Sequence, residues 1–139
     1  MSGATQDRPL AAVQTLESTV FRLGQLARRL LAEYPDAGLI VDTCHVFGHD
    51  DGESSSQLEL RAPDVDAVRA VCAALGAEAH TKTVDHHIVM EHVRGETTLD
   101  GVCVKVRAFR HFSSEESAVW RAEQDQAATA SAQAPGGAE

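Results

Sequence analysis

The chain has 139 residues, 43% of them hydrophobic, and a formal net charge of −9. That length suits one domain with a buried core. The excess of acidic groups argues against general binding to nucleic acid phosphates or anionic membranes, which depends on Lys and Arg. No apolar run reaches the roughly 18 residues of a membrane span, and the first residues lack the basic start and apolar stretch of a signal peptide. We therefore expect a single cytoplasmic domain with no membrane partner.

The three cysteines agree with a cytoplasmic location. Cys44, Cys72 and Cys103 are widely spaced and form no C-x-x-C pair, so they indicate neither a disulfide framework nor a zinc ribbon. Cys72 lies in an apolar run and is expected to pack as a small buried hydrophobic residue.

The N-terminal third is predicted to be a helix. Residues 1–8 are small and polar and are predicted to be disordered. Over 9–34 the apolar residues lie three or four positions apart, which places them on one helical face. That face is predicted to contain Val13, Leu16, Val20, Leu23, Ala27, Leu30 and Tyr34. Phe21 and Leu31 make it wider than a coiled-coil seam, so we expect the helix to lie on a sheet and to end before Pro35.

A hairpin and a second helix are predicted next. Residues 39–47 are rich in β-formers, 48–56 are turn-forming throughout, and 57–61 alternate apolar and polar residues, which is typical of a hairpin. A helix then begins after Asp64 and ends at Gly76, a residue suited to a C-cap. Its buried face is predicted to contain Val65, Val68, Val71, Cys72 and Leu75.

Three further strands are predicted, at 77–83, 87–93 and 102–109. The last of these is the clearest, because valines alternate with Cys103, a lysine and an arginine. Asp100-Gly101, directly before it, favours a type I′ hairpin turn.

The C-terminal segment is predicted to contain a short helix and a tail. Ser113 and Glu116 have the spacing of a capping box, so a helix is predicted over 113–126. Residues 127–139 are of low complexity and are predicted to form a disordered acidic tail.

These elements predict one α+β domain over 9–112. The expected architecture is a two-layer sandwich, an antiparallel sheet with two helices on one face, in the order α-β-β-α-β-β-β. An open sheet has edges that need to be paired, covered or charged, so homodimerisation is one expected way to protect them.

Two phrases carry a resemblance to known proteins. Residues 68–78 read V-R-A-V-C-A-A-L-G-A-E and residues 99–106 read L-D-G-V-C-V-K-V. The chain resembles small actinobacterial and actinophage α+β proteins in which a second helix ends in Leu-Gly-Ala before a Leu/Val-Asp-Gly-Val hairpin. The resemblance implies a compact α+β fold and no particular activity. The histidine-rich phrase at 85–92 and the long tail depart from that pattern.

Seven histidines are an unusual number for this length, and imidazole is a common metal ligand. A zinc site needs three or four ligands within roughly 2.0–2.3 Å of one ion. The candidate metal ligands are His45, His49, His86, His87 and His92. The alternative is that they decorate a solvated loop or sheet face, and their spacing matches no established ligand pattern.

No phosphate-loop, dinucleotide-binding, serine hydrolase or H-E-x-x-H motif is present in the sequence. Acid–base chemistry by His87 or His92 beside Asp85 or Glu91 is the enzymatic alternative. No catalytic residue is assigned, and no cofactor is expected apart from the zinc alternative.

The last predicted hairpin is locally basic, and an otherwise polar tail contains the single tryptophan. Its basic residues are Arg94, Lys105, Arg107, Arg110 and His111. Aromatic residues that could stack on bases are scarce around them, so nucleic acid binding is not expected. Lys105, Arg107, Val119 and Trp120 are the candidate residues for contact with an unknown protein partner. The alternatives are that the two basic residues decorate a solvated sheet face, and that Trp120 and Val119 dock onto this domain or stay exposed in the tail. The sequence therefore favours a non-enzymatic binding or regulatory accessory protein, with a histidine-rich metal-binding or small-ligand module, or an enzyme, as the alternative.

Overall fold

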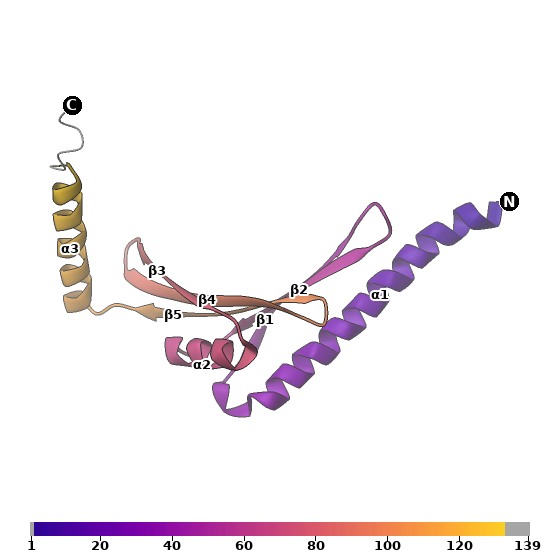
Figure 1. Ribbon diagram of the computed structural model, residues 1–139, viewed down its shortest axis with the longest axis horizontal. Coiled ribbons are helices and arrows are strands. Elements are labelled where there is room, and N and C mark those ends of the chain that lie inside the picture. The colour runs from indigo at the N-terminus through magenta and orange to yellow at the C-terminus, as the bar shows by residue number, and fades with distance from the viewer. Residues whose placement is uncertain (1, 133–139) are drawn as a thin grey trace.

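The computed structural model describes residues 2–132, which form three helices and one sheet (Figure 1). The elements follow in the order α1 (Ser2–Glu33), η1 (Pro35–Ala37), β1 (Ile40–Gly48), β2 (Ser54–Arg61), α2 (Val65–Leu75), β3 (Ala79–Asp85), β4 (Val89–Leu99), β5 (Val102–His111) and α3 (Ser114–Ala132). The predicted α+β class and the order α-β-β-α-β-β-β are confirmed, with α3 added at the end. Within the described residues, no helix is both long and apolar enough to cross a membrane.

The sheet has five strands in the order β1-β2-β5-β4-β3. Three of its pairings are antiparallel, as predicted, whereas β2 and β5 pair in parallel. The exception arises because α2 carries the chain back along the sheet, so that β3 starts from the same end as β2. The β3–β4–β5 meander then returns across the sheet, and its third strand reaches β2 in the same direction.

One core lies between the sheet and the two helices that cover it. α1 packs on β1 and β2, and α2 packs on β3, β4 and β5. Leu58, Leu60, Val104 and Val106 are almost completely buried beneath them. α2 approaches the sheet closely at Gly95. The residue there has to be a glycine, because a Cβ atom would overlap the sulfur of Cys72. Cys72 is buried and free, as the sequence predicts.

The turns and caps follow the predicted chemistry. Asp64 accepts a hydrogen bond from the Ala67 amide at 2.7 Å, which caps the start of α2. Asp100 and Gly101 both have positive φ angles, 51° and 78°, as a type I′ turn requires. At the start of α3 the predicted capping box forms. It consists of reciprocal 3.1 Å bonds in which the Ser113 amide donates to Glu116 Oε1 and the Glu116 amide donates to Ser113 Oγ.

Both terminal helices are longer than predicted. α1 begins at Ser2 rather than at residue 9, so Pro9 lies inside the helix, beyond its first turn, where it has no backbone amide to donate. α3 continues to Ala132, so the predicted disordered tail is helical over 127–132. Residues 133–139 of that tail lie outside the described part of the chain.

The buried face of α1 differs in part from the predicted one. Leu23, Leu26 and Leu30 face the sheet and are buried, whereas Val13 and Val20 are 47% and 54% exposed. Leu26 was not in the predicted stripe. The difference arises because the apolar residues of α1 occupy two neighbouring arcs of the helix, and only one of them faces the sheet.

Candidate functional site

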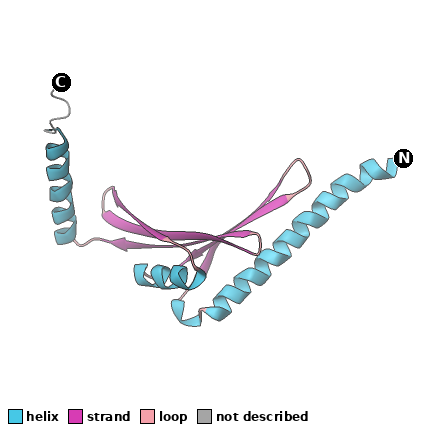
Figure 2. Cartoon of the chain, in the orientation of Figure 1, coloured by secondary structure: helices cyan, strands magenta, loops and turns pink. Residues whose placement is uncertain are grey.

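The sheet has one face covered by helices and one that is not. Successive residues of a strand point to opposite faces, so the core residues of β2 and β5 alternate with side chains on the other side. α2 and the sheet-packed part of α1 lie on the same side (Figure 2). We call the opposite side the open face. α3 projects from the end of β5 away from α2.

Basic side chains form a row across the open face. The strand register places Arg94 of β4 directly opposite Arg107 of β5, and Arg107 opposite Arg61 of β2. His80 of β3 continues the row beyond Arg94. Neighbouring strands lie only about 4.8 Å apart, and like charges directly opposite each other destabilise a sheet. The arginines of this row therefore need compensation from other charged groups.

The next row along the same strands is balanced. Lys105 lies between Glu96 of β4 and Glu59 of β2, so charges of opposite sign alternate across the strands. The Glu59 carboxylate accepts hydrogen bonds from Thr43 Oγ1 at 2.6 Å and from Gln57 Nε2 at 2.9 Å. These bonds, the one from Thr43 above all, hold the pKa of Glu59 below its ordinary value. The contrast makes the arginine row the feature that calls for an explanation.

A β-bulge compensates part of the basic row. The register of β1 shifts between Val41 and Thr43, so Asp42 is an additional residue in the strand. Its carboxylate accepts hydrogen bonds from Arg107 and, at 2.9 Å, from Arg61. Those two bonds, first the one from Arg107, lower the pKa of Asp42, so it stays ionised near neutral pH. Arg61 and Arg107 are thus partly neutralised.

The β3–β4 end of the row has no such compensation. Among the described residues, no carboxylate pairs with Arg94 or Lys82. His80, Lys82, His92 and Arg94 line a shallow hollow of about 340 Å³ together with Thr81. We refer to His80, Lys82, His92, Arg94 and Arg107 as the basic cluster.

His92 has an unusual environment within the basic cluster. Its ring stacks on Phe109, with 4.5 Å between ring centroids and 11° between planes. Its buried Nε2 atom and the buried Nε atom of Arg107 form no hydrogen bond within residues 2–132. Burial lowers the pKa of His92, and the charges of Arg107, Arg94 and Lys82 lower it further. Buried polar atoms normally have partners, so these two nitrogens are unsatisfied hydrogen-bonding groups within the basic cluster.

The predicted metal ligands lie at separate places. His45 is on β1 beside Phe47, and His49, at the β1–β2 turn, is 3.0 Å from Ser55 Oγ. His86 and His87 lie in the turn between β3 and β4, and His92 is on β4. No three His, Cys, Asp or Glu side chains within the described range are grouped to hold an ion. The structure therefore does not bring the five histidines together, because the strand order places β1 and β3 at opposite edges of the sheet.

The predicted partner-contact residues occupy two regions. Lys105 and Arg107 both lie on the open face, but only Arg107 belongs to the basic cluster. Val119 is exposed on α3 and Trp120 is half-buried. The base of α3 is fixed by Arg121, which donates to Asp85 at 2.9 and 3.3 Å. Neither Val119 nor Trp120 lines the hollow that the basic cluster forms.

Sequence reasoning missed the contribution of His80 and Lys82. They are two positions apart in a strand that the sequence predicts, so a shared face could have been expected. Their position beside Arg94 and His92 depends on the register between β3 and β4, which the sequence pattern does not specify.

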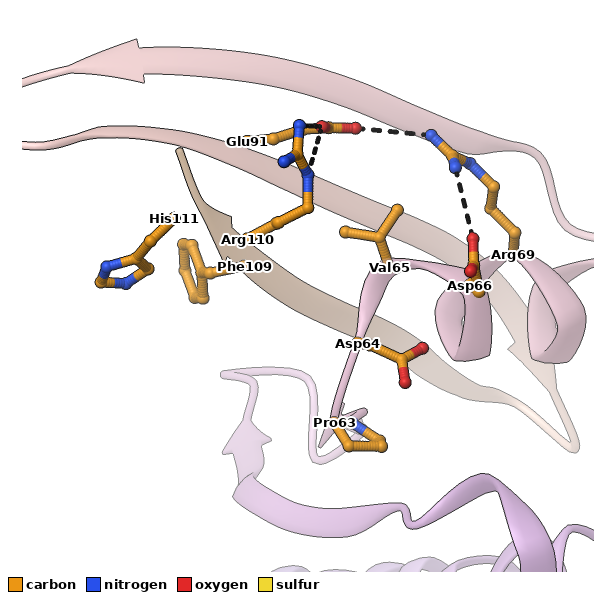
Figure 3. Close-up of a pocket in the computed structure, with 9 residues that line it drawn as sticks. All are labelled: Pro63, Asp64, Val65, Asp66, Arg69, Glu91, Phe109, Arg110 and His111. Atoms are coloured by element: carbon orange, nitrogen blue, oxygen red, sulfur yellow. Dashed lines mark hydrogen bonds and ion pairs between the residues drawn. The ribbon is translucent and has the colours of Figure 1, made fainter. Parts of the chain in front are cut away.

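The hollow in Figure 3 lies at the N-terminal start of α2 and has a volume of about 600 Å³, and several of the charged residues that line it pair with each other. Arg69 bridges Asp66 and Glu91, at 3.8 and 3.5 Å. Arg110 bridges Glu91 and Glu116, at 3.0 and 2.8 Å. This chain of ion pairs connects α2, β4, β5 and α3, so we interpret it as a structural network.

The open face also carries a thiol, that of Cys103 on β5. Cys103 donates a hydrogen bond to Glu96 Oε1 at 3.2 Å. Burial, followed by that bond, raises the pKa of the thiol, so it stays protonated and is a poor nucleophile.

Comparisons with protein-family models, with curated proteins and with solved structures give no match.

Proposed function

We propose that the chain is a non-enzymatic binding protein that recognises an acidic segment of a partner protein through the basic cluster. The observation that carries this proposal is the β3–β4 end of the cationic row, on the open face, where no carboxylate among the described residues pairs with Arg94 or Lys82. Carboxylates from a partner would relieve the like-charge repulsion between Arg94 and Arg107. They would also accept hydrogen bonds from Arg94 and Lys82, which no carboxylate among the described residues engages.

The surroundings of the cluster favour a segment that also carries an apolar side chain. Ile40 and Phe109 are half exposed, and together with Arg61 and Pro63 they line a second hollow of about 440 Å³. Arg61 connects this hollow to the basic row. A peptide could therefore place carboxylates on the basic cluster and an apolar side chain beside Phe109. The requirement for both kinds of side chain would make binding specific for such a peptide.

A protein segment fits this face better than a nucleic acid. Asp42, Glu59 and Glu96 share the face with the basic cluster, and the whole chain has a net charge of −9. These three carboxylates and the negative net charge would repel an extended polyanion. Among residues 2–132, Phe109 is the one phenylalanine in contact with the basic cluster, whereas surfaces for single-stranded nucleic acids use several aromatic rings as stacking platforms.

Fluorescence anisotropy with a labelled dodecapeptide of alternating Glu and Ser and one central Leu tests this proposal. Arg94→Ala and Lys82→Ala are each expected to weaken binding by up to about fivefold, the value of an exposed ion pair. Arg22→Ala is the matched control, because it removes the same charge from the exposed surface of α1. Binding should weaken as salt is added.

Two outcomes would overturn the proposal. If Arg22→Ala weakens binding as much as Arg94→Ala, the peptide responds only to the overall charge. If a single-stranded oligothymidylate of the same length binds more tightly and loses affinity in the same two variants, the face is a nucleic acid surface.

We also propose a cytoplasmic location. The support is that Cys44, Cys72 and Cys103 are free cysteines, which is typical of a reducing compartment. Cys44 is exposed and would be oxidised readily outside one.

A further inference from the structure

α1 has a second apolar stripe that the sheet does not cover. Phe21 is 67% exposed and Leu10 is 56% exposed, and Val13, Val20 and Leu31 are exposed with them. Positions 10, 13, 17, 20, 24, 27 and 31, which hold Leu, Val, Glu, Val, Gly, Ala and Leu, have the alternating three-and-four spacing of a coiled-coil seam, and Phe21 lies beside it. The sheet lies against one side of α1 only (Figure 1). The stripe is therefore shaped to receive another helix.

A glycine occupies the middle of this stripe. Gly24 lies in the interior of α1, where glycine is less favourable than alanine. A Cβ atom on Gly24 would meet no atom of the protein within 4 Å. Packing within the chain therefore does not require a glycine, but a second helix approaching closely would.

Two unpaired charges flank the glycine. Glu17 and Arg28 are 11 residues apart, which places them on nearly the same side of the helix and about 16 Å apart. Neither side chain forms an ion pair among the described residues. Consider a second copy of α1, antiparallel to the first and related to it by a two-fold axis midway between these residues. Glu17 of each copy would then lie against Arg28 of the other, which gives two equivalent ion pairs.

The same axis pairs Phe21 with Gly24. Because 17 and 28 have the same midpoint as 21 and 24, the ring of Phe21 would fill the space left by Gly24 of the second copy. Leu31 would lie near Val13 of the second copy in the same arrangement. Shape and charge thus agree on one self-complementary geometry, which is the property of a two-fold symmetric interface.

We infer that two copies of this chain associate through the exposed stripe of α1, antiparallel, about an axis between Phe21 and Gly24. The stripe lies on the helical layer, and the basic cluster lies on the opposite face of the sheet. The dimer would therefore leave both basic clusters free, and a bivalent protein would gain avidity for a partner with repeated acidic segments. The inference does not depend on the proposed ligand.

Size-exclusion chromatography with light scattering measures the mass of the assembly that the 139-residue chain forms. The test loads the protein at concentrations between about 1 and 100 μM, because association depends on concentration. The chain is expected to be a dimer, and Phe21→Ala and Gly24→Leu are expected to shift it to monomer. Glu17→Arg and Arg28→Glu should each weaken the dimer, and the double variant should restore it. Arg22→Glu, on the opposite side of α1, serves as the charge control and should leave the mass unchanged.

A chain that is monomeric over the whole range would overturn the inference. So would a dimer whose mass is unaffected by Phe21→Ala and by both single charge reversals, since it would use another surface. Far-ultraviolet circular dichroism identifies any variant that has failed to fold, and the charge-reversal pair then remains as the test.

Discussion

The two faces of the sheet are built from alternate residues of the same strands and have opposite chemistry. On the helix-covered face, Leu58, Leu60, Val104 and Val106 are almost fully buried in one core. Glu59 and Lys105, which lie between these core residues in sequence, point to the open face together with the arginines of the basic row. The first face forms the core on which folding depends, and the second carries charged side chains that contribute nothing to that core.

The comparison shows which parts of the open face need an interpretation beyond stability. The Glu96–Lys105–Glu59 row follows the usual rule of cross-strand charge pairing. The Arg94–Arg107–Arg61 row breaks that rule one step away on the same strands. Local rules of stability tend to be broken at functional sites, which is why the basic cluster carries the proposed function.

The largest difference between the two faces should appear in stability. Leu60→Ala removes a fully buried side chain and is expected to lower the free energy of unfolding by about 2–5 kcal/mol. Lys105→Ala, on the open face of the neighbouring strand, is expected to change it by less than about 0.5 kcal/mol. Urea denaturation of the two variants measures both. Equal losses would show that the open face also contributes to the core.

A smaller loss is expected where α2 approaches the sheet. Gly95→Ala would place a Cβ atom against the Cys72 sulfur and should cost about 1–3 kcal/mol through overpacking. Cys72→Ala removes that sulfur, so the double variant should be more stable than the sum of the two single changes predicts. Additive effects in thermal unfolding would contradict the close contact between Cys72 and Gly95.

A subtler test concerns the electrostatics of the open face. The pKa of His92 lies below its ordinary value of 6.5 because of burial and the neighbouring cations. The unfolded chain therefore binds this proton more readily, and the free energy of unfolding should fall as pH drops from about 6.5 towards the folded pKa. Arg94→Ala should raise the His92 pKa, as measured by NMR titration of the imidazole protons. An unchanged or lower pKa would mean that Arg94 does not act on this ring.

Much of the fold could be predicted because it depends on local chemistry. Asp64 and Gly76 define the ends of α2, and Asp100-Gly101 defines the last hairpin, through interactions within a few residues. The parallel pairing of β2 with β5 could not be predicted in this way, because it depends on which strands become neighbours. The exposure of Val13 and Val20 depends likewise on how α1 rotates against the sheet.

The candidate site was only partly predictable for the same reason. Arg94 and Arg107 could be recognised as basic residues of one hairpin, and their alternation predicted a shared face. Their alignment with Arg61 and His80 comes from the register of three strand pairs. The histidines that suggested a metal site are spread over opposite edges by that same strand order.

The most direct test of the proposed function is a two-dimensional NMR titration of the ¹⁵N-labelled chain with the Glu-Ser dodecapeptide. The account predicts that amide shifts concentrate at Lys82, His92, Arg94 and Arg107, and that the peptide raises the pKa of His92 because a nearby carboxylate favours the imidazolium ion. Shifts confined to other surfaces, with an unchanged His92 pKa, would contradict the assignment of the basic cluster as the binding site.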